Sequence, residues 1–148
     1  MAGTKSYVAK PKEIEKQWWL VDADNQIVGR LASKIAVILM GKHRPTYTSH
    51  LDTGDFVIVV NCDKIQFTGD KWASKTYTWF TGYTGLRLET AQARLERCPE
   101  LILREAVRRM LPKNKLGEKM LNKLKLYAGT EHPHQAQNPQ SLTIDTNA

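Results

Sequence analysis

FVIVV, residues Phe56 to Val60, is a run of five apolar residues, four of which are branched at Cβ. Branching at Cβ favours an extended backbone, and a run without polar alternation is typical of a strand that is covered on both faces. Nearer the N-terminus, WWLV at residues 18–21 is a second bulky apolar run, and turn-forming residues follow it. The sequence therefore predicts two buried strands, at residues 18–21 and 56–60.

Between these two strands the apolar residues repeat at helical spacing. Leu31, Ile35, Ile38 and Leu39 share one face of a helix that begins near residue 29. Gly41 follows, and a glycine at this place commonly ends a helix in the left-handed conformation. A strand, a helix and a doubly buried strand in this order predict a parallel βαβ unit with helices on the sheet faces, so the predicted fold class is α/β.

Further elements are predicted in the rest of the chain. Apolar and β-branched residues predict short strands at residues 65–68 and 75–80, and helical patterns cover residues 90–97 and 99–111. Pro112 ends the second of these helices, and Asn114 is placed to cap a last helix in which Leu116, Met120 and Leu124 share a face. We expect a single domain, residues 1–148, with a basic arm at residues 1–16 and a loosely held polar tail at residues 140–148.

The chain has 148 residues and a net charge of +7, and most of this charge is concentrated in one segment. Residues 104–125 contain eight basic residues against two acidic ones, and residues 25–51 contain no acid at all. Positive charge that is concentrated in this way attracts a polyanion, because each neutralised phosphate releases counterions. Nucleic acid is therefore the predicted class of partner.

Composition and motifs exclude several other classes of protein. Cys62 and Cys98 are far apart in sequence, so we predict neither disulfide nor zinc site and expect both thiols to be reduced and buried. The longest apolar run, residues 35–40, is too short to cross a bilayer. Gly41 and Lys42 lack the other residues of a phosphate-binding loop. We thus expect a cytoplasmic protein without membrane contact, metal, cofactor or small-molecule substrate.

EHPHQAQNP, residues 131–139, is the segment that most resembles a chemical site. In an extended backbone His132 and His134 would point the same way and could start a metal site or act in proton transfer. A metal would need further ligands, and no nucleophile motif accompanies the histidines. The aspartates near the predicted strand ends are assigned to turns and caps. We favour surface or nucleic-acid contacts for this segment.

The lysines at positions 115, 119 and 123 form a row beside the apolar face of the last predicted helix. A solvated helix face would explain such a row, but that kind of face normally mixes both signs of charge, and here Glu118 is the only acid. The row is therefore interpreted as phosphate-binding and outward-facing.

Four aromatic residues lie close together between positions 77 and 83: Tyr77, Trp79, Phe80 and Tyr83. Aromatic rings of this kind could stack on nucleic-acid bases, or they could belong to the core. Because the strands are so apolar, the core assignment is favoured, and these residues are left out of the predicted site.

Several blocks, in order, resemble one family along almost the whole chain from residue 18 to residue 139. They are WWLVDADNQIVGRLASKIAVILMGK (18–42), DTGDFVIVVNCDKIQFTGDK (52–71), AVRRMLPKNKLG (106–117) and KLKLYAGTEHPHQAQNP (123–139). The resemblance is to the bacterial-type ribosomal protein L-thirteen family of the large subunit. It implies a three-layer α/β/α fold around a mostly parallel sheet of about four strands, binding to large-subunit ribosomal RNA beside neighbouring large-subunit ribosomal proteins, and a role early in subunit assembly. The chain departs from the family pattern at Arg109 and at residues 78–87.

Charge and resemblance together predict a non-catalytic structural protein of the large ribosomal subunit. The alternatives are a small α/β enzyme that uses its paired histidines with or without a metal, and a regulatory RNA-binding protein that acts outside the ribosome. The predicted RNA-binding residues are Arg30, Lys34, Lys42, His43, Arg44, Lys71, Lys75, Arg104, Arg108, Lys113, Lys115, Lys119, Lys123, Lys125, His132 and His134.

Overall fold

Four parallel strands form the central sheet of the computed structural model, which describes residues 7–144. Strands β1 (Trp18–Asp22) and β2 (Phe56–Val60) pair in parallel along their whole length. β5 (Leu124–Leu126) pairs with β2, and β6 (Gln140–Ser141) pairs with β1, both in parallel, so the strand order is β5-β2-β1-β6. The predicted parallel sheet of about four strands is confirmed, although two of its strands come from other residues than expected.

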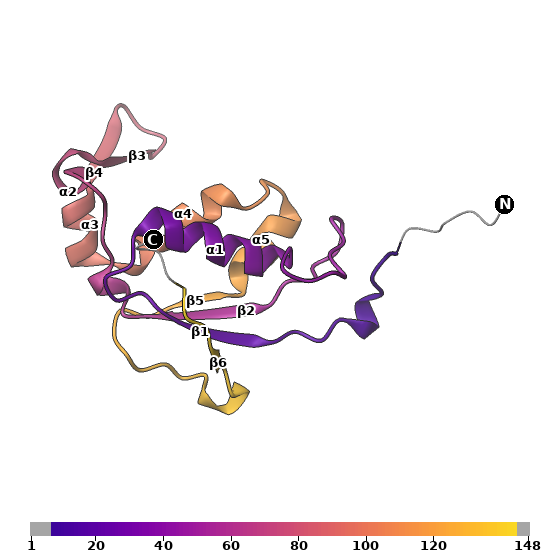
Figure 1. Ribbon diagram of the computed structural model, residues 1–148. Coiled ribbons are helices and arrows are strands. Elements are labelled where there is room, and N and C mark those ends of the chain that lie inside the picture. Colours follow the sequence, from indigo (N-terminus) through magenta and orange to yellow (C-terminus); the bar gives the residue numbers. More distant parts are fainter. Residues whose placement is uncertain (1–6, 145–148) are drawn as a thin grey trace.

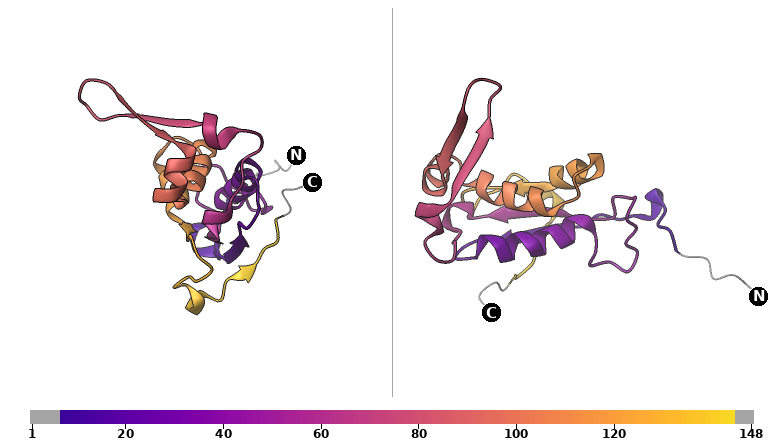
Figure 2. Two further views of the ribbon diagram at one scale, coloured as in Figure 1. Left: turned by 90° about the vertical axis from the view of Figure 1, so that its left-hand side faces the viewer. Right: turned by 90° about the horizontal axis from the view of Figure 1, so that it is seen from above.

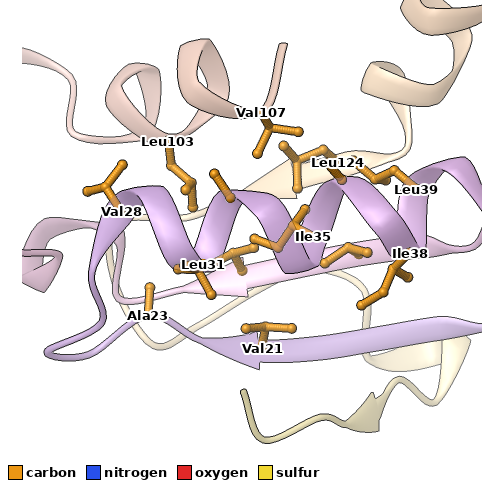
Figure 3. Packing of buried hydrophobic residues seen from close by; sticks show 14 of the residues in the cluster. Val21, Ala23, Val28, Leu31, Ile35, Ile38, Leu39, Leu103, Val107 and Leu124 are labelled. Carbon is orange, nitrogen blue, oxygen red and sulfur yellow. The ribbon is translucent and has the colours of Figure 1, made fainter. Parts of the chain in front are cut away.

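Helices α1 (Val28–Met40), α4 (Glu100–Met110) and α5 (Lys115–Asn122) cover one face of this sheet (Figure 1). Right-handed crossovers from β1 to β2 and from β2 to β5 require these helices to lie on the same side. Figure 3 shows the core between them, where side chains of α1 such as Leu31 and Ile35 meet Leu103 and Val107 of α4. All four side chains are fully buried, and each such burial contributes roughly 1.5–3 kcal/mol to folding.

The opposite face of the sheet is covered by the segment that returns the chain from β5 to β6 (Figures 1 and 2). This segment includes the 3-10 helix η3 (Gln135–Gln137). Beneath it, the rings of Trp18 and Phe56 stack with their centroids 4.2 Å apart, and the ring of His134 lies 5.3 Å from that of Trp18. Ile58 is also fully buried. The fold is therefore α/β with three layers, of which the second outer layer is thin.

A two-stranded antiparallel hairpin stands apart from the sheet (Figures 1 and 2). It consists of β3 (Thr76–Phe80), which was predicted, and β4 (Leu86–Thr90), which was not. The short helix α2 (Lys71–Ser74) precedes the hairpin, and α3 (Ala91–Arg97) follows it. The predicted helix at residues 90–97 is confirmed, since the Thr90 side chain caps α3 by accepting from the backbone N–H of Ala93.

Several predictions of local structure are wrong. Residues 65–68 form no strand, because the 3-10 helix η2 (Cys62–Lys64) and a left-handed Gly69 leave only an isolated bridge between Gln66 and Ile27. Helix α5 ends at Asn122, since residues 124–126 continue as β5. The polar tail begins with a strand, β6, although residues 145–148 lie outside the described range.

The core assignment of the aromatic cluster is confirmed only for Tyr77. Tyr77 is buried, whereas Trp79, Phe80 and Tyr83 are 40%, 67% and 84% exposed. The last three residues are exposed because the hairpin does not join the sheet. Tyr77 is buried because the guanidinium of Arg94 lies over its ring. Of the two thiols, Cys62 is buried as predicted, and burial raises its pKa to about 12, while Cys98 is only half-buried.

The predicted N-terminal arm lies only partly within the described residues. Of the predicted arm, residues 1–6 lie outside the described range, and residues 7–16 include the 3-10 helix η1 (Pro11–Glu13). The arm is fastened to the body where the backbone N–H of Ala9 donates to the hydroxyl of Thr48. Across residues 7–144 no helix has both the length and the apolar character needed to cross a bilayer.

Candidate nucleic-acid interface

A buried carboxylate fixes the loop that follows α1. Gly41 ends α1 in the left-handed conformation, and the chain then turns back toward β2. Asp55 is fully buried just before β2 and accepts from the guanidinium of Arg44 at 2.6 Å and from the backbone N–H of Gln17 at 2.9 Å. Its other oxygen accepts from the indole N–H of Trp19 at 3.2 Å. The imidazole of His43 is a fourth group in contact with this carboxylate.

The Nε2 atom of His43 lies 2.9 Å from Asp55, so one carboxylate holds two of the predicted loop residues, His43 and Arg44. Arg44 also donates to the backbone carbonyl of Glu15 at 2.6 Å, and only 20% of its side chain is exposed. These contacts give His43 and Arg44 a structural role, and Asp55 balances the charge that Arg44 could offer to a phosphate. Lys42, the third predicted residue of the loop, is exposed.

Lys123 does not face outward, which corrects the predicted lysine row. The residue follows α5 and is only 4% exposed, because the chain leaves the helix there to enter β5. Its ammonium donates to the carbonyls of Leu39 and Gly54 at 3.2 and 2.9 Å and pairs with Asp52. Desolvation by burial lowers the pKa of Lys123 despite its pairing with Asp52. Lys123 joins α1, the loop before β2 and β5, and its ammonium is out of reach of any phosphate.

Arg30, Lys71 and Lys75 gather around one cleft of about 440 Å³ at the N-terminal end of α1. The sequence predicted all three, although they come from α1, α2 and the start of the hairpin. Phe67 and Tyr77 form apolar walls of the cleft, and the ammonium of Lys75 lies 5.9 and 5.3 Å from the centroids of their rings. The fold thus brings cations that are distant in sequence to one concave surface.

Arg109 lines the same cleft from α4, and sequence reasoning left it out of the predicted site. Its charge was visible in the sequence, but the position of the hairpin beside α4 was not. Arg109 and Arg108 also line a neighbouring hollow between α4 and the hairpin, together with Arg94. Arg94 is less available there, since its guanidinium lies 3.9 Å from the ring of Tyr77 and pairs with Glu89.

A third hollow of about 340 Å³ follows at the turn between α4 and α5, and Arg108, Lys113 and Lys115 line it. Asn114 caps α5 by accepting from the backbone N–H of Gly117 at 2.8 Å. Gly117 is required here, because a Cβ at this position would overlap the carbonyl oxygen of Pro112. The cap and the close approach hold Lys113 and Lys115 at the edge of the hollow.

The three hollows adjoin along α4, since Arg109 is shared by the first two and Arg108 by the last two. We call this surface the basic track, and it is formed by Arg30, Lys71, Lys75, Arg109, Arg108, Lys113 and Lys115. The acids in its lining are Glu105, which pairs with Arg108 at 3.0 Å, and Glu118. Within residues 7–144, Lys71, Lys75, Arg109, Lys113 and Lys115 make no ion pair. The track therefore carries an excess of uncompensated positive charge.

Besides Lys123 and the loop residues Lys42, His43 and Arg44, four more predicted basic residues lie outside the basic track. Lys34 on α1, Arg104 on α4 and Lys119 on α5 are exposed, and Lys125 on β5 is half-buried. By the register of the sheet Lys125 is opposite Ile58, so it lies on the face that η3 covers rather than with the helices. The structure does not gather these four residues with the track.

The two histidines of EHPHQAQNP make contacts inside the protein, in the second outer layer of the fold. His134 Nε2 lies 2.8 Å from the hydroxyl of Tyr127, and the ring packs beside Trp18. His132 turns back, and its Nδ1 accepts from the backbone N–H of His134 at 3.3 Å. The segment bends and enters η3, so it is not the extended backbone in which the two imidazoles would point the same way. Among residues 7–144, no group of three or more His, Cys, Asp or Glu side chains could hold a metal ion.

Comparison with known proteins gives a consistent result over nearly the whole chain. The model of the family described as Ribosomal protein L13 matches residues 16–133. The large ribosomal subunit protein uL13 of Thermoanaerobacter sp. (strain X514) is 53% identical over 142 residues, which are 95% of this chain and 99% of the relative. The proteins of the same name from Thermotoga maritima and Aquifex aeolicus are 54% and 55% identical over 141 residues, which are 95% of this chain and 95% and 98% of the relatives. This chain belongs to the ribosomal protein L13 family.

Proposed function

We propose that this protein is a structural constituent of the large subunit of the cytoplasmic ribosome, where it binds ribosomal RNA and supports early assembly of the subunit. Its relatives are named as large-subunit ribosomal proteins, which also argues against the enzyme alternative. The observation that carries the RNA-binding part of the proposal is the basic track, in which cations from α1, α2, the hairpin, α4 and the α4–α5 turn line one continuous surface.

The chemistry of the track suits a folded RNA backbone. Lysine and arginine bind phosphates mainly through charge, and the released counterions provide much of the free energy of binding. The track also contains guanidinium groups at Arg108 and Arg109, which can donate two parallel hydrogen bonds to one phosphate. A concave surface lined by such groups can hold the convex phosphate backbone of an RNA. Contacts of this kind fix the position of the RNA without recognising its base sequence.

The first turn of α1 adds a further feature that favours phosphate. Positive potential is expected at this end of the helix, because the backbone N–H groups of its first turn have no acceptor within the helix, although that of Val28 donates to the carbonyl of Gln66. Gly29 lines the cleft, and a Cβ added there would meet no neighbouring atom within 4 Å, so the space beside this residue is open. Lys71 and Lys75 lie in the same cleft, and their charges add to that of the helix end.

Sedimentation of cell extracts tests the proposed function directly. The tagged chain is expected to travel with large subunits in a sucrose gradient, and the variant Lys71→Glu/Lys75→Glu is expected to shift toward the top. The matched control is Lys64→Glu, because Lys64 is exposed on η2 and lines none of the three hollows. A wild-type chain found only at the top would overturn the ribosomal role and favour the regulatory alternative. Equal sedimentation of all three chains would instead overturn the role of the track.

A further inference from the structure

The register of the β3–β4 hairpin separates its side chains into two faces. Tyr77 is opposite Glu89 and Trp79 is opposite Arg87, so these four residues share one face. The other face, which we call the apolar hairpin face, consists of Thr76, Thr78, Phe80, Leu86, Leu88 and Thr90. Because side chains alternate along each strand, every charged residue of the two strands is on the first face.

The first face is turned toward the body of the protein. The guanidinium of Arg94 lies 3.9 Å from the centroid of the Tyr77 ring, and Glu89 accepts from Arg94 and Arg97 at 2.7 and 2.9 Å. These contacts fasten the base of the hairpin to α3. The apolar hairpin face consequently points away from the body, and the hairpin projects from the rest of the molecule (Figure 2).

The apolar hairpin face leaves a large amount of hydrophobic surface in contact with water. Phe80, Leu86 and Leu88 are 67%, 64% and 68% exposed, and Phe80 is directly opposite Leu86. Tyr83, at the tip, is 84% exposed. Trp79 is also exposed, so five of the ten large hydrophobic side chains that are exposed within residues 7–144 belong to this one hairpin. A concentration of this kind is typical of a docking surface.

The composition of this face indicates whether its neighbour in a ribosome is RNA or protein. Proteins that stack on unpaired bases combine aromatic rings with cations, which neutralise the phosphates beside each base. The apolar hairpin face has one aromatic ring within its strands, two leucines and three threonines, and it has no cation. A phosphate brought against it would lose water without gaining a partner, which is unfavourable. An uncharged protein surface has no such cost.

We propose that the apolar hairpin face docks on an uncharged, apolar surface of a neighbouring protein in the large subunit. This inference rests on the proposed function, because it takes the assembled subunit as the setting. It assigns the two kinds of partner to different parts of the molecule. The basic track faces RNA, and the hairpin reaches past it to protein.

Photo-crosslinking inside assembled subunits tests this assignment. The variant Leu88→p-benzoylphenylalanine is made in cells, large subunits are isolated by sedimentation and irradiated, and the linked species are identified by mass spectrometry after nuclease treatment. The expected product is a link to one ribosomal protein. The comparison variant Lys113→p-benzoylphenylalanine, in the basic track, is expected to link to RNA.

Subunits that contain the Leu88 variant but link it to RNA, to a second copy of this chain or to nothing would overturn the docking proposal and leave the proposed function intact. Absence of both variants and of the wild-type chain from the subunits would overturn the proposed function, and the docking proposal with it.

A second measurement does not depend on a crosslinker. The variant Phe80→Thr/Leu86→Thr/Leu88→Thr keeps residues that favour strands, so the hairpin should form, and circular dichroism together with the urea midpoint checks that it folds. Binding of the isolated variant to ribosomal RNA should equal that of wild type, whereas its release from purified subunits in a salt wash should be roughly 10-fold faster. Weakened RNA binding by the isolated variant, or unchanged release from subunits, would contradict the proposal.

Discussion

Asp55 and Lys123 carry opposite charges inside the protein, and each is surrounded by groups that satisfy it. Asp55 holds the loop after α1 through Arg44 and His43, and Lys123 holds the end of α1 through the carbonyl of Leu39. Placing an ion in a protein interior is costly unless its partners remain, so the loss of one partner leaves an uncompensated charge. Each of these ions therefore ties together segments that are far apart in sequence.

Replacement of Asp55 by alanine should destabilise the protein strongly. The substitution removes the charged partner of Arg44 and the acceptor of the Trp19 indole N–H, and breaking a buried pair in this way typically costs about 3–5 kcal/mol. Urea denaturation measures the change in the free energy of unfolding. Glu13→Ala is the control, because the Lys10–Glu13 pair is exposed and its loss should change stability by less than about 0.5 kcal/mol. Similar effects of the two substitutions would show that Asp55 has no special role.

Asp52 should make the stability of the protein sensitive to acid. Burial raises the pKa of this carboxyl, but the hydrogen bonds and charges of Lys123 and Lys16 outweigh burial, and the net pKa lies below the ordinary value of 3.8. The unfolded chain thus binds a proton more readily than the folded one. The contribution of Asp52 is complete above its unfolded pKa and is lost as the pH falls through the lower folded pKa.

Urea denaturation of wild type and of Asp52→Asn at about pH 6 and about pH 3 measures this contribution. Wild type is expected to lose more free energy of unfolding between the two pH values than the variant, which has no carboxyl to protonate at this position. An equal loss in the two proteins would mean that the Asp52 pair does not contribute to the acid sensitivity.

At the scale of the elements, the sequence predicted regular, apolar segments well and short ones poorly. The strands at 18–21 and 56–60 and the helix between them follow from burial patterns that repeat over many residues. β5 and β6 have only three and two residues, and they are strands because the sheet offers them backbone partners, which no local pattern reveals. β4 was missed although its leucines alternate with charged residues at the spacing of a strand, because this alternation covers only five residues.

The turn between α4 and α5 depends on a single glycine. A Cβ at Gly117 would overlap the Pro112 carbonyl, so Gly117→Ala must displace the turn or the start of α5, and overpacking of this kind costs about 1–3 kcal/mol. Thermal or urea unfolding measures the loss. The matched variant is Gly29→Ala, where a Cβ would meet nothing within 4 Å and alanine favours the helix by up to about 1 kcal/mol. Equal stability of the Gly117 variant and wild type would contradict the close approach described for this turn.

For the molecule as a whole, the site could be predicted in its chemistry but only partly in its residues. Six of the seven residues of the basic track were predicted, because local charge excess is visible in the sequence. Arg109 was not among the predicted residues, and Lys123 was predicted to face outward but is buried, since whether a cation faces a cleft or the interior depends on packing between distant segments. His43, Arg44 and His134 are likewise engaged by internal partners.

The most direct test of the account is the salt dependence of binding to large-subunit ribosomal RNA. If the five cations of the basic track that make no ion pair within residues 7–144 each neutralise a phosphate, a plot of log K against log salt should have a slope of about −3.5 to −4.5. Lys71→Gln/Lys75→Gln should make this slope shallower by about 1.5–2, and Lys64→Gln should leave it unchanged. A slope that is the same for wild type and the double variant would contradict the claim that the track grips the RNA backbone.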